Sequence, residues 1–172
     1  IGDASVNADA EVLAVVKDIL DEFKVEAEIY VNNRKLINAL IESVQISQKK
    51  AVMRELDKLD KIGEDNVKSN LRKFADANQI LTLFKLLEKD IEFFKKNAFD
   101  GAEELIELQK LGKLYGYKVK ISPTLMRGLS YYTGNVFEVR GKEGSSIAGG
   151  GRYDKSVGKY LGREIPAVGI SF

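Results

Sequence analysis

The sequence contains neither cysteine nor histidine in its 172 residues. Without cysteine there can be no disulfide bond and no thiolate nucleophile. Without histidine there can be no Ser-His-Asp triad and no imidazole general base, and the two absences together exclude zinc sites built from these residues. Any chemistry that this chain performs must therefore use Arg, Lys, Tyr, carboxylates or backbone amides.

A long apolar segment and a leader sequence are also missing. No apolar run reaches about 18 residues, the length that a membrane-spanning helix needs. No basic stretch followed by an apolar stretch opens the chain, so we expect no secretory signal and a cytoplasmic location. The chain starts at Ile1 rather than Met and stops within an apolar run at Phe172, and we expect it to be a piece of a longer protein.

Glycine is scarce in the first hundred residues, which hold only Gly2 and Gly63, whereas the last 72 residues hold the other 13 glycines and both prolines. This distribution predicts helices first, then strands and turns. Residues 1–45 carry 4 basic and 9 acidic side chains (net −5), residues 46–112 carry 13 and 13 (net 0), and residues 113–172 carry 10 and 4 (net +6). The basic, glycine-rich last third is therefore a candidate for holding an anion.

Hydrophobic periodicity places a helix, a strand and a second helix in the first segment. Asn7 is a candidate helix cap, because it precedes apolar residues at helical spacing. Residues 27–32 alternate between apolar and polar side chains, which predicts a half-buried strand. Asn33 is the candidate cap of the second helix.

The chain is helical by period from Ser47 to Leu114. We expect one helix to begin at Ser47 and to end at Gly63 in a left-handed turn. Two pairs of residues have the spacing of capping boxes and are expected to start further helices: Asp76 with Gln79, and Asp100 with Glu103. The apolar row of the first of these helices runs to Phe94.

After Gly116 the period changes to two. Strands are expected at residues 117–122, 131–140, 145–148 and 166–172, with a short helix at residues 154–161. The short glycine turns between these strands favour antiparallel pairing.

The sequence thus predicts an α+β fold, in which an antiparallel sheet is flanked by helices and interrupted by an inserted helical bundle. Residues 1–45 and 115–172 are expected to form the two parts of the core, and residues 46–114 the inserted bundle.

The stretch from Arg127 to Gly134 reads Arg-Gly-Leu-Ser-Tyr-Tyr-Thr-Gly. An arginine before a glycine can bring a rigid five-donor guanidinium close to the backbone, which suits a phosphate or a carboxylate. Successive strand residues point to opposite faces, so one of Tyr131 and Tyr132 can present its phenol to a ligand while the other packs. The alternative is that Arg127 is a surface ion-pair partner and that both tyrosines are ordinary strand residues.

A second stretch has three consecutive glycines, residues 149–151, followed by Arg-Tyr-Asp. Glycines between a strand and a helix start allow a close backbone approach and can form a nest of N–H groups for an anion. The pattern is neither a Walker A loop nor a spaced Gly-x-Gly-x-x-Gly. The alternative is a tight connection that needs positive φ angles.

In order and spacing, three stretches of the chain resemble the catalytic domain of histidyl-tRNA synthetase, a class II aminoacyl-tRNA synthetase family. They are Arg127 to Glu138, Ile147 to Asp154, and Pro166 to Gly169. The resemblance extends over essentially the whole chain, with residues 46–114 in the place of the family's helical insertion domain. Many members of the family carry Asp at the position of Ser130.

The resemblance implies a six-stranded antiparallel sheet flanked by helices, a homodimer, and an insertion that approaches the tRNA acceptor stem. It also implies a reaction in which L-histidine is activated by ATP, with Mg²⁺, to histidyl-adenylate and then transferred to tRNA(His). No metal ligand is expected within this chain, and no membrane partner.

Roles for individual residues follow from the resemblance by matching position. Arg127 is the expected catalytic residue, which binds the histidine carboxylate and the α-phosphate as the adenylate forms. Tyr132 is expected to hydrogen-bond the substrate imidazole, and Tyr131 to line the same pocket. The floor of the pocket near the amino group is expected to consist of Gly149, Gly150, Gly151 and Tyr153.

Motif 1, most of motif 2 and motif 3 of the family are missing from the sequence. We therefore expect a ligase in the longer protein and no aminoacylation by this chain alone. The alternative is a non-catalytic synthetase-like module that binds histidine or tRNA, such as the regulatory subunit of ATP phosphoribosyltransferase, because such proteins can keep the same stretches.

Overall fold

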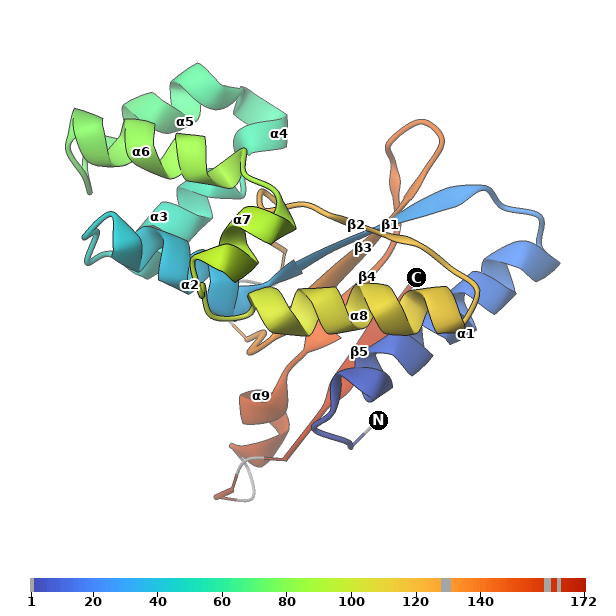
Figure 1. Cartoon of the computed structure of the whole chain (residues 1–172). Helices are drawn as coiled ribbons and strands as arrows, with labels where there is room; N and C mark the ends of the chain where they lie inside the picture. The colour runs from blue at the N-terminus through green and yellow to red at the C-terminus, as the bar shows by residue number, and fades with distance from the viewer. Residues whose placement is uncertain (1, 128–130, 160–161, 164) are drawn as a thin grey trace.

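The computed structural model of the chain describes residues 2–127, 131–159, 162–163 and 165–172. Within these ranges one sheet has the strand order β2-β1-β3-β4-β5 (Figure 1). The strands are β1 (Ala27–Asn33), β2 (Val119–Ile121), β3 (Asn135–Gly141), β4 (Ser146–Arg152) and β5 (Val168–Ser171).

The sheet is mixed and mostly antiparallel, which confirms the predicted α+β class. β1 pairs with β3, β3 with β4 and β4 with β5 in antiparallel fashion, whereas β1 and β2 are parallel. A parallel pair needs a long crossover, and the helical segment between β1 and β2 supplies it. The prediction of a wholly antiparallel sheet is therefore wrong at this one pairing.

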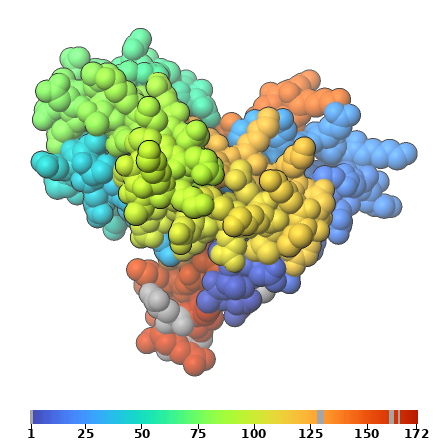
Figure 2. Space-filling model, in the orientation of Figure 1, coloured from blue at the N-terminus to red at the C-terminus, as the bar shows by residue number. Residues whose placement is uncertain are grey.

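Some of the described helices cover one face of the sheet, others form a lobe beside it, and a short one follows the end of β4 (Figure 1). They are α1 (Val6–Glu22), α2 (Arg34–Ser43), α3 (Lys49–Leu56), α4 (Leu59–Ile62), α5 (Glu64–Leu71), α6 (Ala77–Leu87), α7 (Ile91–Lys96), α8 (Ala102–Leu114) and α9 (Asp154–Gly158). We call α3, α4, α5 and α6 the helical lobe. Figure 2 shows the surface hollowed between this lobe and the hairpin that joins β3 to β4.

The core lies where α1 and α8 pack side by side against the sheet. Side chains that are fully excluded from solvent come from both layers: Leu13, Val31, Leu105, Leu108, Phe137 and Val139. Because α8 contacts α1 and β1, the end of the predicted bundle segment packs on the core. The division of the chain at residues 45 and 114 stays a prediction. In the described ranges, no helix combines the length and the apolar character that crossing a membrane requires.

Two of the predicted helix starts are confirmed. The Asn33 side chain accepts a hydrogen bond from the backbone N–H of Lys35 at 2.8 Å, which caps α2. Asp76 and Gln79 form the full capping box at the start of α6. Both signals depend only on residues within one turn, so the sequence is sufficient to reveal them.

Two other predicted starts are wrong. α1 begins after Ser5, and Asn7 lies inside the helix, where its side chain donates to Glu11 at 3.2 Å. α8 begins after Gly101, which has a φ of 82°, rather than in a capping box at Asp100. A Cβ at position 101 would overlap the side chain of Asn33, so the contact between α8 and the start of α2 requires glycine there.

Two predicted long helices are each divided in two. The helix expected from Ser47 to Gly63 breaks after Leu56 into α3 and α4, although Gly63 does have the expected positive φ, 79°. The helix expected to reach Phe94 breaks into α6 and α7, and Asp90 caps the second piece by accepting from the backbone N–H of Phe93 at 2.8 Å. Hydrophobic periodicity continues across both breaks and therefore does not report them.

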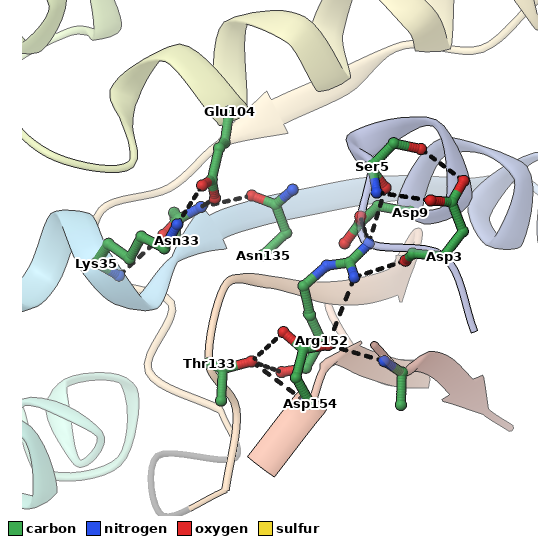
Figure 3. A network of polar contacts seen from close by, with 11 residues as sticks. Asp3, Ser5, Asp9, Asn33, Lys35, Glu104, Thr133, Asn135, Arg152 and Asp154 are labelled. Atoms are coloured by element: carbon green, nitrogen blue, oxygen red, sulfur yellow. Dashed lines mark hydrogen bonds and ion pairs between the residues drawn. The ribbon is translucent and has the colours of Figure 1, made fainter. Parts of the chain in front are cut away.

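A buried ion pair holds the N-terminal segment against β4 (Figure 3). The Arg152 guanidinium binds the carboxylate of Asp9, and both side chains are buried. It also donates to the backbone carbonyls of Asp3 and Ser5, both at 2.8 Å. This arginine of the Arg-Tyr-Asp stretch is thus a structural clamp between α1 and β4.

A second polar cluster joins α8 to the start of α2 (Figure 3). The Glu104 carboxylate accepts from the Asn33 side chain at 2.6 Å and pairs with Lys35. Asn33 also donates to the side chain of Asn135 in β3 at 2.8 Å. The cluster fixes α2 relative to the neighbouring strands β1 and β3.

Candidate functional site

The candidate site lies on the face of the sheet opposite α1 and α8. In β4, Gly149 pairs with Glu138 of β3, and Gly151 pairs with Val136 of β3 and Gly169 of β5. Residues that are directly opposite in paired strands point to the same face. Gly149, Gly151 and Gly169 therefore leave part of this face without side chains, so that side chains from other segments can lie directly on the backbone. We call this part the glycine face.

Arg127 lies over Gly149. A Cβ at position 149 would overlap the guanidinium, so only glycine permits this approach. Arg127 Nε lies 3.0 Å from Glu138 Oε1, and Nη2 donates to the hydroxyl of Ser146 at 2.7 Å. Within the described part of the chain Nη1 makes no hydrogen bond, and 44% of the side chain is exposed. Arg127 is thus anchored on two sides and still offers donors to an anion.

Three tyrosines gather on the same face. A Cβ added at Gly151 would lie 3.0 Å from the ring of Tyr132. A Cβ added at Gly169 would lie 3.0 Å from the hydroxyl oxygen of Tyr153. The rings of Tyr131 and Tyr132 are in contact, with centroids 4.4 Å apart. Burial raises the pKa of Tyr132, and its hydrogen bond with Tyr131 raises it further. The Tyr132 phenol therefore keeps its proton at neutral pH and can donate a hydrogen bond.

The structure corrects the strand predicted at residues 131–140. β3 begins only at Asn135, so Tyr131 and Tyr132 precede the strand. Their rings contact each other instead of pointing to opposite faces. The period-two argument that separated the two tyrosines therefore does not apply, and both belong to one group of aromatic side chains.

The structure also corrects both interpretations of the glycine triplet. Gly149, Gly150 and Gly151 lie inside β4, and none of them has a positive φ. They form neither an anion nest nor a tight turn. A Cβ added to any of the three would overlap a neighbour. At Gly149 the neighbour is Arg127, at Gly150 it is the backbone of β5, and at Gly151 it is the Asn135 carbonyl together with Tyr132. Glycine is required at these positions because neighbouring atoms leave no room for a Cβ, and not because the backbone adopts an unusual conformation.

A cleft of about 240 Å³ separates this face of the sheet from the helical lobe. Its lining comes from both sides and includes Asp57, Asp60, Met126, Arg127, Glu138 and Arg140. Glu138 and Arg140 were not among the site residues predicted from the sequence. Alternation along β3 places both on one face, two positions apart, and this spacing of opposite charges is the signal that could have found them.

Two predicted features lie outside the described residues. One is the segment that includes Gly128 and Ser130, and the other is the end of the short helix predicted to reach Leu161. Among the residues that are described, no group of three or more carboxylates lies close enough together to hold a metal ion.

Comparison with known proteins identifies the family. The family model described as histidyl-tRNA synthetase matches residues 1–172. Histidine–tRNA ligase 1 of Bacillus cereus is 36% identical over 191 residues, which cover 100% of this chain and 44% of the relative. The chain spans less than half the length of the curated relatives it matches.

Solved structures agree with the sequence comparison. Histidyl-tRNA synthetase from Nostoc sp. PCC 7120 superposes with a TM-score of 0.90 at 29% identity, over 98% of this chain and 45% of that chain. A protein from Bacillus halodurans described as ATP phosphoribosyltransferase regulatory subunit/histidyl-tRNA synthetase gives a TM-score of 0.82 at 26% identity, over 99% of this chain and 48% of that one.

Proposed function

The chain belongs to the histidyl-tRNA synthetase family of class II aminoacyl-tRNA ligases, and we propose that it is part of the catalytic core of a histidine–tRNA ligase. The full-length ligase would activate L-histidine with ATP and transfer it to tRNA(His) as a homodimer. One observation carries the proposal: Arg127 lies on the glycine face of the sheet beside a group of three tyrosines, and its Nη1 makes no hydrogen bond to any described residue.

In the activation step, an oxygen of the histidine carboxylate forms a bond to the α-phosphorus of ATP, and pyrophosphate leaves with the electrons of the broken P–O bond. The nucleophile is already ionised at neutral pH, so no general base is needed. Negative charge grows on the oxygens of the α-phosphate. Arg127 Nη1 is placed to stabilise this charge, while Glu138 and Ser146 hold the rest of the guanidinium.

The tyrosines select the substrate in this proposal. Tyr132, whose phenol stays protonated, donates to the unprotonated nitrogen of the substrate imidazole, and Tyr131 lines the same pocket. Tyr153 and the glycines at 149–151 form the floor near the amino group. This chain contributes no imidazole of its own to the site, because it contains no histidine.

The division of the chain into core and insertion is also a proposal. Residues 1–45 and 115–172 would form core, and residues 46–114 the helical insertion, which α8 anchors to α1. The 172-residue chain by itself would not catalyse the reaction, because the family's motif 2 and motif 3 arginines are absent from it. Mg²⁺ would accompany ATP in the full-length ligase.

A regulatory subunit is the second candidate, because the B. halodurans protein carries that description beside the synthetase name. Histidine-dependent exchange of pyrophosphate into ATP by the full-length protein separates the two. Exchange would establish the ligase. Histidine binding without exchange would establish the regulatory module.

Tyr132→Phe should raise the KM for histidine by about tenfold, because an imidazole nitrogen left unpaired in a closed site costs roughly 1–3 kcal/mol. The ring over Gly151 is retained, so the fold should not change. Steady-state pyrophosphate exchange of the full-length ligase measures the effect. Tyr115→Phe is the matched control, since that hydroxyl bonds Asn7 far from the site. An unchanged KM would remove Tyr132 from the imidazole pocket.

Gly149→Ala should lower kcat by about 10- to 100-fold, because the added methyl group displaces the Arg127 guanidinium from its place on β4. Gly141→Ala in β3 is the control, since the nearest atom to its new methyl group, at 3.3 Å, is the end of the Ile147 side chain. Thermal melting of both variants separates loss of folding from loss of catalysis. Wild-type turnover in a folded Gly149→Ala protein would contradict the proposed position of Arg127.

A further inference from the structure

Glu138 is held between two arginines. Its Oε1 lies 3.0 Å from Arg127 Nε. Its Oε2 accepts from Arg140 Nε at 2.7 Å and lies 2.6 Å from Arg140 Nη2. Only 9% of the Glu138 side chain is exposed. Separating a carboxylate this well buried from its cationic partners is energetically costly, so the positions of Glu138 and Arg127 depend on each other.

Arg140 continues the chain of charges into the helical lobe. Its Nη2 also lies 3.5 Å from Asp60 Oδ2 on α4. Its guanidinium lies over the ring of Tyr30, 4.8 Å from the centroid, which restricts its motion. Asp60, Arg140, Glu138 and Arg127 therefore form a continuous row of alternating charge across the cleft, from the lobe to the glycine face of the sheet.

We propose that Glu138 is a positioning residue for Arg127, and that Arg140 and Asp60 extend it into an ion-pair relay through which the placement of α4 affects histidine activation. This inference rests on the proposed ligase function for its kinetic consequence. The ion pairs on which it is built do not depend on that function, so the coupling between them can be tested without any activity.

The geometry determines how strongly the loss of Glu138 or of Asp60 should affect the position of Arg127. Arg127 has a long, partly exposed side chain, and Glu138 supplies the charged anchor that fixes it. Asp60 shares Arg140 with Glu138, so the loss of Asp60 removes one of the two carboxylates that hold the Arg140 guanidinium and leaves the position of Glu138 less fixed. Because 78% of the Asp60 side chain is exposed, its ion pair is screened and its effect should be small.

Pyrophosphate exchange by variants of the full-length ligase tests the kinetic consequence. Glu138→Gln should lower kcat by about 10- to 100-fold and change the KM for histidine by less than about threefold. Glu138→Asp keeps the charge and should recover part of the loss. Asp60→Asn should lower kcat about two- to fivefold, while Asp57→Asn, an exposed aspartate lining the same cleft, should leave it unchanged.

A raised kcat in Glu138→Gln would overturn the proposal, since Glu138 would then compete with the substrate for Arg127 instead of positioning it. An unchanged kcat in that variant would also overturn it. Equal effects of Asp60→Asn and Asp57→Asn would show general electrostatics of the cleft and would refute the relay.

A spectroscopic arm uses the 172-residue chain and needs no activity. The Nε–H resonance of Arg127, assigned by its loss in Arg127→Lys, should shift in Glu138→Gln and, by less, in Asp60→Asn, but not in Asp57→Asn. An unshifted resonance in Glu138→Gln would refute the contact, and one in Asp60→Asn would refute the relay. If the wild-type ligase shows no exchange while these shifts occur, the proposed function fails and the relay stands.

Discussion

We expect Arg127→Ala in the full-length ligase to lower kcat for histidine activation by about 100- to 1,000-fold, with a much smaller effect on the KM for histidine. Loss of one preorganised donor at a developing oxyanion costs roughly 3–4 kcal/mol, which corresponds to this range. Arg127 provides such a donor, because Glu138 and Ser146 already hold its guanidinium before any ligand arrives.

The separation of kcat from KM is the essential part of this result. An arginine that bound the ground state and the transition state equally would raise KM and leave kcat alone. Arg127→Lys keeps the charge but loses the planar fork, so we expect it to recover only a small part of the loss. Lys142 lies on the hairpin and forms an exposed ion pair with Glu26, so Lys142→Ala removes the same charge without touching the contacts of Arg127 and should have no effect. Unchanged turnover in Arg127→Ala would exclude this residue from the mechanism.

The second large effect is on stability. We expect Arg152→Met to lower the free energy of unfolding of the 172-residue chain by about 3–5 kcal/mol, because it leaves the Asp9 carboxylate buried without its cation. Burial already raises the pKa of Asp9, which shows how costly its charge is at this place. For a chain of this length the melting temperature should fall by about 6–20 °C.

A double variant distinguishes this cause from simple loss of packing. In Asp9→Leu with Arg152→Met, no charge stays buried, so most of the lost stability should return. Lys142→Met breaks an exposed ion pair and should cost less than about 1 kcal/mol. Denaturant unfolding followed by circular dichroism measures all three. If the double variant is less stable than Arg152→Met alone, the buried-charge explanation is wrong.

The parts of the fold that the sequence predicts correctly depend on local signals. Alternation identified β1, and the caps at Asn33 and Asp76 marked two helix starts, because each of these patterns is complete within a few residues. The requirement for glycine at position 101 does not come from a local signal. Glycine is needed where α8 meets the beginning of α2, and no local pattern reports a contact between segments so far apart.

The glycine triplet shows the same limit for the site. Three glycines in a row indicate a turn when only neighbours along the chain are considered. In the structure they are strand residues, because Arg127 and Tyr132 lie against β4 from another segment. The residues alone made Arg127, Tyr131 and Tyr132 candidates for contact with a ligand, and the family resemblance assigned their specific roles and added Tyr153. The pairing of Glu138 with both arginines depends on the register of β3 and on the lobe, so it was visible only in the structure.

The most direct test of the proposed site is a crystal structure of the full-length ligase with a non-hydrolysable analogue of histidyl-adenylate. We predict that Arg127 Nη1 lies within hydrogen-bond distance of the group that replaces the α-phosphate, while Arg127 Nε stays on Glu138. The imidazole should lie against Tyr132, over the glycine face of β4. An analogue bound elsewhere, with no contact to Arg127 or Tyr132, would contradict the proposed site.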